Sequence, residues 1–360
     1  MEFLPRTSGA RPRLACELRS EGIVAARADE ASDLLAAISR SNLGNAVLPL
    51  VRVGEVPGSH AFGTERPAVV AALRKAVEAV LQRSRDLTLI VPDGAARVLL
   101  LDFDALPTKP AEALSVVRFR LKKLVPFEVE HAAVSYQVMA SSRDSIQVLA
   151  VAMPGDLIAE YESLVHDAGF EPGAVLPSTL AAIAGLREGD RPALVVNACH
   201  DGVTTAIVHG GMLLLHRTVD LSASASSSPE YDPCATAVAP TTPAETSISA
   251  IAARLAAGRT AVVSEPPAAP AANASRTEIT QAVSVAGAYF EDTLEAHPSV
   301  ILSAGTLGAA ALTGMLDSAG IRPVAVQELV DRNMLGVGAS TGAAAIPLGW
   351  LAGVRGALTL

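Results

Sequence analysis

Aromatic residues and cysteines are scarce in this chain. Phe, Trp and Tyr make up only 3% of its 360 residues, so it lacks the aromatic platform on which single-stranded nucleic acid stacks. The three cysteines, Cys16, Cys199 and Cys234, stand far apart in the sequence and form none of the close pairs that zinc sites use. These absences predict no metal site and no nucleic-acid partner, and they suit a reducing compartment.

An excess of basic residues and an apolar leader are also missing. The chain has 28 Lys and Arg against 37 Asp and Glu, a formal net charge of −9, whereas binding to a phosphate backbone depends on Lys and Arg. Met1–Arg13 contains arginines but no apolar stretch of a secretory signal. The uncharged stretch Leu335–Val354 is long enough for a bilayer, but its five glycines and Pro347 favour a C-terminal helix instead. We therefore expect no membrane span.

Apolar residues are abundant, and their pattern recurs in two halves. They form 50% of the sequence, and a chain of this length exceeds the size at which single cores usually divide into domains. Three strand patterns open each half, and a helical pattern follows. The expected strands are Leu14–Leu18, Ile23–Arg27, Ala46–Val53, Ala193–Ala198, Val203–His209 and Met212–Thr218, and the expected helices are Pro67–Arg83 and Glu278–Ala296. The repeat predicts a duplicated α/β architecture.

The stretch Leu114–Val138 predicts a unit of helix, stop and strand. Apolar residues recur at helical spacing up to Val125, and Pro126 ends the helix because proline has no N–H to donate. Alternating apolar residues up to Val138 then indicate a strand. The helix carries a basic flank, which favours a solvated face over contact with an anionic membrane surface: Arg118, Arg120, Lys122 and Lys123.

Fragments of this region stand in the same order as in a known family. They read IVPDGAARV at Ile90–Val98, KLVPFE at Lys123–Glu128 followed by SYQV, and VAMP at Val151–Pro154 followed by DAGFEP. In this order they resemble the PilM family, the actin-like proteins of type IV pilus assembly. The resemblance implies an α/β, actin-like duplicated fold, with an inserted helix-and-strand subdomain and a reduced lid subdomain.

The resemblance also divides the chain into parts. Residues 1–187 would form actin-like domain I, with the inserted subdomain at about 105–152. Residues 188–336 would form actin-like domain II. Within domain II, residues 221–276 are rich in Ser, Ala and Pro, which predicts a flexible segment because such a composition buries little apolar surface. Residues 337–360 would form a C-terminal helix that packs back on domain I.

The two turns that bind ATP in the actin-like fold are altered in this chain. In the family each turn carries Asp-x-Gly, where the acid orients Mg²⁺ or water and the glycine admits backbone N–H groups to the phosphates. Here they read Glu17-Leu18-Arg19 and Asn197-Ala198-Cys199. We therefore expect no ATP hydrolysis and no bound cofactor, with ATP and Mg²⁺ as the alternative. The residues at the family's nucleotide-side positions are Glu17, Asn197, Thr204, Thr205 and Gly305.

The resemblance further implies a protein partner. PilM-like proteins bind the short cytoplasmic N-terminal segment of PilN, an inner-membrane protein, and work with other pilus assembly proteins. The expected location is cytoplasmic, peripheral at the inner membrane. The peptide would lie extended beside the unit around Pro126, and the partner-binding candidates are Arg120, Leu124, Val125, Pro126 and Phe127.

Two other functions stay open. One is a functional actin-like ATPase, which requires Glu17 or another acid to hold Mg²⁺ and a cleft that tolerates Arg19. The other is a GspL-like type II secretion assembly protein, whose actin-like domain is followed by a transmembrane helix.

Overall fold

The computed structural model describes most of the chain except its N-terminus and one long internal segment. The described residues are 12–29, 34–52, 56–81, 83–186, 191–221, 270–321, 325–336, 339 and 346–359.

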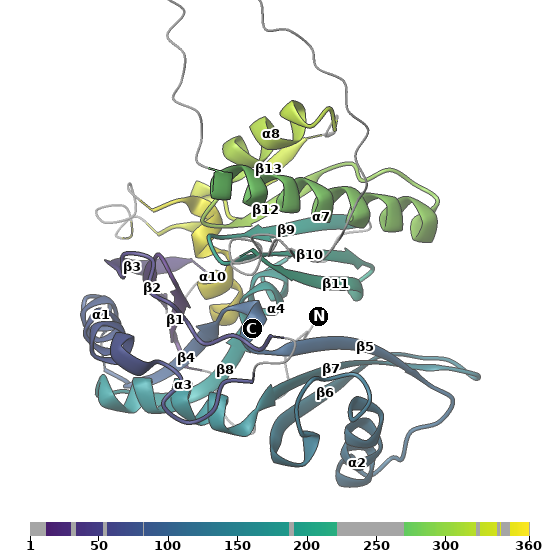
Figure 1. Cartoon of the computed structure of the whole chain (residues 1–360), viewed down its shortest axis with the longest axis horizontal. Coiled ribbons are helices and arrows are strands. Elements are labelled where there is room, and N and C mark those ends of the chain that lie inside the picture. Colours follow the sequence, from purple (N-terminus) through teal and green to yellow (C-terminus); the bar gives the residue numbers. More distant parts are fainter. Residues whose placement is uncertain are drawn as a thin grey trace, which may run out of the picture.

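Two five-stranded sheets with the same topology form the two halves of the molecule (Figure 1). The strand order is β3-β2-β1-β4-β8 in the first sheet and β11-β10-β9-β12-β13 in the second. Each sheet joins three antiparallel strands to two parallel ones, which confirms the predicted duplication. The strands are β1 (Leu14–Arg19), β2 (Gly22–Ala28), β3 (Leu35–Asn42), β4 (Asp86–Val91), β8 (Glu171–Pro177), β9 (Ala193–Ala198), β10 (Gly202–His209), β11 (Met212–Asp220), β12 (Ile301–Gly305) and β13 (Val326–Glu328).

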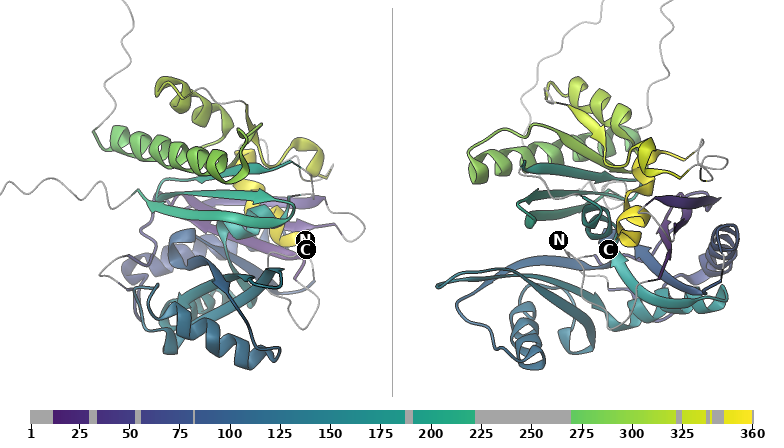
Figure 2. Two further views of the ribbon diagram at one scale, coloured as in Figure 1. Left: turned by 90° about the vertical axis from the view of Figure 1, so that its right-hand side faces the viewer. Right: turned by 180° about the vertical axis from the view of Figure 1, so that it is seen from behind.

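Helices cover both faces of both sheets and produce five layers (Figure 2). Helices α1 and α3 pack on the outer face of the first sheet, and α7 and α8 pack on the outer face of the second. Helices α4 and α10 lie between the two sheets. The helices are α1 (Arg66–Glu78), α3 (Gly155–Asp167), α4 (Ser178–Ala184), α7 (Pro270–Leu294), α8 (Ala309–Ser318) and α10 (Ala352–Leu358).

The alternation of strands β1 and β9 decides which side chains face the space between the sheets. Successive side chains of a strand point to opposite faces. Leu18 packs towards α1 and α3, so Glu17 and Arg19 point inwards, towards α4 and α10. In the same way Val196 packs towards α7 and α8, which leaves Asn197 on the inner face. Because side chains alternate along each strand, Glu17, Arg19 and Asn197 all lie in the layer between the two sheets.

Helix α10 packs directly on α4 and on strands β1 and β2. Two glycines permit this close approach, because a Cβ on Gly356 would lie 1.8 Å from the Ala181 carbonyl oxygen and one on Gly353 would lie 2.6 Å from Glu17 Oε2. The expected helix over 337–360 is too long: a 3₁₀ turn occupies Leu348–Leu351 and the α-helix begins only at Ala352.

A third sheet extends from domain I, with the strand order β5-β7-β6 and helix α2 packed on it. It lies to the right of the first sheet in Figure 1. Because β5 belongs to this sheet, the inserted subdomain begins at Arg97 rather than at about residue 105. Its elements are β5 (Arg97–Phe103), α2 (Pro110–Leu121), β6 (Ala132–Ser141) and β7 (Ile146–Pro154).

Two further expectations differ from the structure. The third strand of domain I is Leu35–Asn42 rather than Ala46–Val53, and α7 already begins at Pro270, so the end of the predicted flexible segment is helical. The remainder of that segment, 222–269, lies outside the described residues. Among the described helices, none is both long and apolar enough to cross a membrane.

Candidate functional site

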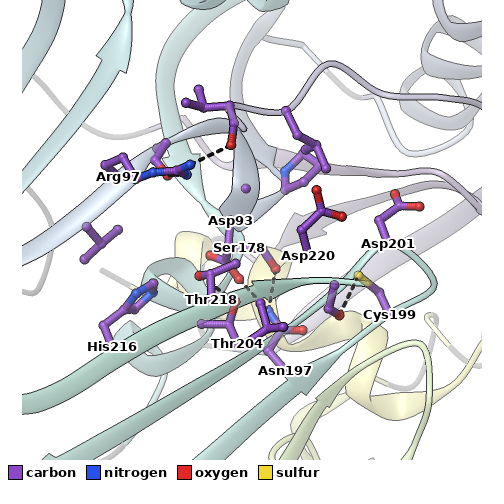
Figure 3. Close-up of a pocket in the computed structure, with 18 of the residues that line it drawn as sticks. Asp93, Arg97, Ser178, Asn197, Cys199, Asp201, Thr204, His216, Thr218 and Asp220 are labelled. Atoms are coloured by element: carbon purple, nitrogen blue, oxygen red, sulfur yellow. Dashed lines mark hydrogen bonds between the residues drawn. The ribbon is translucent and has the colours of Figure 1, made fainter. Parts of the chain in front are cut away.

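The turns β1–β2 and β9–β10 face each other across a cavity between the two domains. The cavity has a volume of about 260 Å³. Domain I contributes residues from β1, β5, α4 and the turn that follows β4, and domain II contributes residues from β9, β10 and β11. Its polar lining, shown in Figure 3, includes Asp93, Arg97, Ser178, Asn197, Asp201, Thr204, His216, Thr218 and Asp220.

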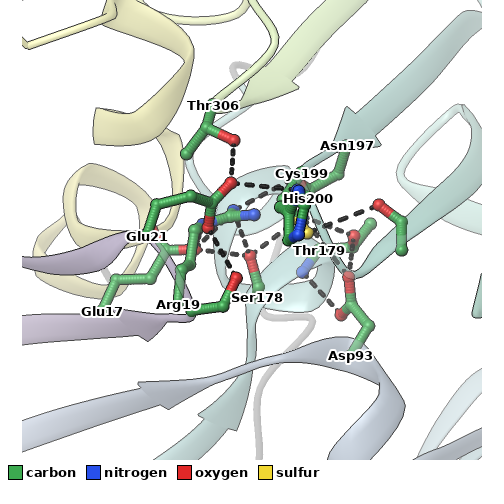
Figure 4. Close-up of polar contacts among 12 residues, drawn as sticks. Glu17, Arg19, Glu21, Asp93, Ser178, Thr179, Asn197, Cys199, His200 and Thr306 are labelled. Carbon is green, nitrogen blue, oxygen red and sulfur yellow. Dashed lines mark hydrogen bonds and ion pairs between the residues drawn. The ribbon is translucent and has the colours of Figure 1, made fainter. Parts of the chain in front are cut away.

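Arg19 is almost fully buried and binds residues of both domains (Figure 4). Its guanidinium forms an ion pair with Glu17, with Nη2 lying 2.6 Å from Oε1. The same Nη2 donates to Ser178 Oγ at 2.8 Å and to Asn197 Oδ1 at 3.0 Å. Ser178 in turn donates to Glu17 Oε1 at 2.6 Å. Arg19, at the position where the resemblance predicts glycine, thus directs its positive charge into the space between the two turns.

The network continues from Asn197 to the end of strand β4. Asn197 Nδ2 donates to Ser178 Oγ and to Thr179 Oγ1, each at 2.9 Å. Asp93 accepts from the Thr179 backbone N–H at 2.8 Å and from the Thr179 hydroxyl at 2.5 Å. Asn197 therefore links domain II to two residues at the start of α4, and these hydrogen bonds fix its amide orientation.

A second polar contact closes the same interface at the β1–β2 turn. Glu21 Oε1 accepts from the Thr306 hydroxyl at 2.6 Å and from the His200 backbone N–H at 2.9 Å. At the other side of the cavity, Arg52 Nε donates to Asp220 Oδ2 at 2.6 Å. Three separate sets of charged groups therefore hold the two domains together.

Burial sets the electrostatics of this network. It raises the pKa of the Glu17 carboxyl, and the Arg19 guanidinium and the Ser178 hydroxyl oppose that rise. Burial alone would lower the pKa of Arg19, but the acidic groups around it, Glu17 first and then Cys199, Glu21 and Asp93, together outweigh burial, so the pKa of Arg19 is raised. For Glu21, burial is outweighed by the Thr306 hydroxyl, the His200 amide, its own backbone N–H and the Arg19 charge together, so its pKa is lowered. Arg19 therefore keeps its charge inside the protein.

The donor set does not match the one that the fold uses for Mg²⁺-ATP. Glu17 Oε1 is engaged by Arg19 and Ser178, and Glu17 Oε2 faces the backbone of α10 at Gly353. Three carboxylates, those of Asp93, Asp201 and Asp220, also line the cavity. Phosphates entering it would lie beside these acids as well as beside the Arg19 guanidinium, which the Glu17 carboxylate already pairs.

The other nucleotide-side candidates fall in different places. Thr204 lines the cavity, with its hydroxyl 3.0 Å from that of Thr218. Thr205 points to the opposite face of β10, and its buried hydroxyl has no hydrogen-bond partner among the described residues. Gly305 has a φ of +89°, and a Cβ there would lie 2.3 Å from the Ala198 carbonyl oxygen. The backbone therefore requires this glycine whether or not a ligand binds.

Several residues of the network were absent from the sequence-based candidates. Asp93 lies in the IVPDGAARV fragment, which is one of those that carry the family resemblance, so the sequence did mark this position. Ser178 and Thr179 begin helix α4 directly after Pro177, which marks a strand-to-helix junction. Nothing in the sequence near Glu21 or Thr306 indicates that they meet, because they are 285 positions apart.

A second cavity, of about 290 Å³, lies between the first sheet and the third. It runs beside β8, an edge strand of the first sheet, and β6, an edge strand of the third. Its lining is apolar except for Thr88 and Ser135 and includes Ala133, Val134, Val151, Met153, Ile158, Ala174, Val175 and Pro177. We call it the β6/β8 groove.

The sequence-based partner candidates do not line this groove. Arg120 and Leu124 are exposed at the end of α2 and in the turn after it. Val125 packs against the core of the third sheet. Phe127 is half-buried and contacts the core of the third sheet as well as the core beneath the first. Pro126 is exposed between them. Of these five residues only Phe127 reaches the junction of the two sheets, and none lies in the apolar cavity.

Comparison with solved structures gives an informative match. No family model and no curated protein sequence matches the chain. A chain of the PilM-PilN type IV pilus biogenesis complex superposes with a TM-score of 0.65 and 16% sequence identity, covering 97% of this chain and 98% of that one. The fold is therefore actin-like. This confirms the fold class predicted from the sequence.

Two further solved structures are more distant. The cytoplasmic domain of EpsL, an inner-membrane component of the type II secretion system of Vibrio cholerae, has a TM-score of 0.38 and 13% identity, covering 58% of this chain and 71% of that one. A protein with actin-like ATPase fold and unknown function from Bacteroides thetaiotaomicron has a TM-score of 0.43 and 8% identity, covering 90% of this chain and 92% of that one.

Proposed function

We propose that the chain is a scaffold of a pilus or secretion assembly machine and that it holds an extended peptide from a PilN-like inner-membrane protein. The observation that carries the proposal is the β6/β8 groove, an apolar cavity between two edge strands. The superposed PilM chain comes from a complex with PilN, which makes a peptide of that kind the first candidate.

The groove suits an extended peptide for two physical reasons. An edge strand presents backbone N–H and C=O groups that pair with an added strand. The apolar lining accepts alternate side chains of that strand, because removing apolar surface from water is favourable. Both requirements meet along β6 and β8, so backbone pairing supplies affinity and the lining supplies selectivity for apolar side chains.

In this proposal the chain works without ATP hydrolysis. Arg19 on β1, held by its ion pair with Glu17, already reaches Ser178 on α4 and Asn197 in domain II, the elements that a nucleotide would bridge. The scaffold is therefore held together by its own side chains, and binding of the partner does not require a nucleotide.

The direct test is binding of a peptide from the N-terminus of the cognate PilN-like protein, measured by titration calorimetry. Ser135→Arg places a long charged side chain in the groove, and the matched control Ser141→Arg makes the same change at the exposed end of the same strand. We expect Ser135→Arg to weaken binding at least about tenfold, because a buried unpaired charge is costly, and Ser141→Arg to leave it unchanged. Equal affinity of both folded variants would exclude the groove, and no binding by the unmodified chain would exclude the partner.

A further inference from the structure

The end of helix α2 presents an exposed aromatic side chain. Ala113, Val117 and Leu121 form the buried face of α2, whereas Phe119 on the opposite face is 73% exposed and Leu124 in the following turn is 48% exposed. The chain has only seven phenylalanines, and burying such a side chain is worth several times the thermal energy. Phe119 is therefore an apolar group whose exposure calls for a partner.

Basic residues surround Phe119. Arg120, Lys122 and Lys123 are exposed at the same end of α2, and Lys122 forms an ion pair with Glu130. Among the described residues the structure gives neither Arg120 nor Lys123 a carboxylate partner. Together with Phe119 and Leu124 these three form what we call the α2 tip. Its local charge is positive, although the whole chain carries −9.

We propose that the α2 tip docks on an anionic phospholipid surface. An exposed apolar group among cations is the combination that binds at the boundary between headgroups and acyl chains, and cations near such a surface are attracted by its negative potential. An anionic membrane repels the rest of this acidic protein, so the basic tip also determines which side of the protein faces the membrane. The inference stands on the exposed residues of α2 and does not rest on the proposed peptide groove.

The shape of the tip favours a lipid surface over a protein groove partner. None of its five residues lines either of the two cavities described above. Helix α2 lies on the outer side of the third sheet, far from α7 and α8 (Figure 1), so it projects from the molecule. A projecting tip with one aromatic side chain can enter the headgroup region of a bilayer without any rearrangement of the domains.

Flotation of the full chain with vesicles tests the proposal without any peptide partner. We expect binding to vesicles of phosphatidylglycerol and phosphatidylethanolamine, and little binding to vesicles of phosphatidylcholine alone. Each basic residue contributes roughly a fivefold change in partitioning, so Arg120→Glu combined with Lys123→Glu should reduce binding at least about tenfold. The matched control, Lys75→Glu combined with Arg332→Glu, makes the same charge change at exposed positions elsewhere and should bind nearly as well as the unmodified chain.

A fluorescence measurement separates insertion from simple charge attraction. In the variant Phe119→Trp, the new indole is exposed, whereas the native Trp350 is buried. Phosphatidylglycerol vesicles should shift the emission of this variant to the blue, and quenching by brominated lipid should follow. No flotation of the unmodified chain, or equal loss of flotation in the control variant, would overturn the proposal. Flotation without a blue shift would also overturn it, since Phe119 would then not enter the headgroup region.

Discussion

The two cavities described above have similar volumes, but only the first contains charged groups. The cavity between the domains, about 260 Å³, combines apolar residues such as Leu50 and Val219 with acids, an amide and hydroxyls, and several of these polar groups bind one another and Arg19. The β6/β8 groove, about 290 Å³, is lined almost entirely by apolar side chains between two edge strands. Buried polar groups must find hydrogen-bond partners, and in the first cavity the chain supplies them for Arg19, Ser178 and Asn197, whereas Glu17 Oε2 and His216 Nε2 have none among the described residues. From this contrast we predict that the two domains stay together without a ligand, whereas the groove has backbone edges that an outside strand can pair.

The strongest test of the first half of this comparison is Arg19→Ala. It leaves the Glu17 carboxylate buried without its cation, and breaking a buried ion pair in this way costs about 3–5 kcal/mol. We expect a clear loss of stability in urea unfolding. The paired variant Glu17→Gln with Arg19→Met removes both charges and should recover at least half of the loss. If Arg19→Ala is no more destabilising than Arg120→Ala on the exposed face of α2, the Arg19 network does not hold the domains.

Phe127→Ala tests whether the third sheet is fixed against the first. The Phe127 ring contacts the cores of both, so its removal creates a cavity at their junction. Full burial would make the loss about 3–5 kcal/mol, and because Phe127 is only half-buried we expect about 2 kcal/mol. Urea unfolding gives the loss, and peptide titration of the folded variant shows whether the groove keeps its width. Unchanged stability would mean that Phe127 does not join the two sheets.

The Glu21 contact predicts a dependence on pH. Its pKa is lowered in the folded protein, so its stabilising contribution is fully present above its ordinary value of 4.5 and is lost as the pH falls through the lower folded value. Glu21→Gln should cost about 1 kcal/mol at neutral pH and less at acidic pH. Urea unfolding of the unmodified protein and of Glu21→Gln, from neutral to acidic pH, gives the difference between their free energies of unfolding. A difference that does not shrink towards acidic pH would contradict the assigned role of Glu21.

The smallest effect on stability is expected for Ser135→Arg in the β6/β8 groove. Ser135 is only half-buried and the groove is open at its edge, so the change should alter stability by about 0.5 kcal/mol or less. Thermal unfolding beside Ser141→Arg measures this. A large loss of stability would mean that the groove belongs to the packed core, and the contrast between the two cavities would then fail.

The sequence was most informative where alternation was regular. The strands β1, β2, β9, β10 and β11 were all expected, because their apolar residues stand at strand spacing. The third strand was assigned to Ala46–Val53, whereas Leu35–Asn42 forms it. In the structure residues 46–51 form an irregular segment containing Pro49, whose carbonyl oxygen accepts from the buried Tyr161 hydroxyl. The apolar residues of this segment are mostly buried, but the segment forms no regular strand, so its apolar character misled the assignment.

The candidate site was only partly accessible to sequence reasoning. Arg19 and Asn197 were recognised as departures from the family's turns, but their mutual hydrogen bond depends on how the two domains pack. Ser178, which binds Glu17, Arg19 and Asn197, gave no signal of its own. The groove was missed for a similar reason: β6 and β8 become neighbours only when the third sheet folds against the first, and spacing along the chain does not record this.

The central claim is that the chain's own arginine takes the bridging role of a nucleotide while the groove is free to bind a partner. Titration of the PilN-like peptide into the unmodified protein, with and without millimolar Mg²⁺-ATP, tests both parts together. The account predicts the same dissociation constant in both conditions and no rise in melting temperature with Mg²⁺-ATP. Peptide binding only in the presence of Mg²⁺-ATP, accompanied by a clear rise in melting temperature, would contradict it.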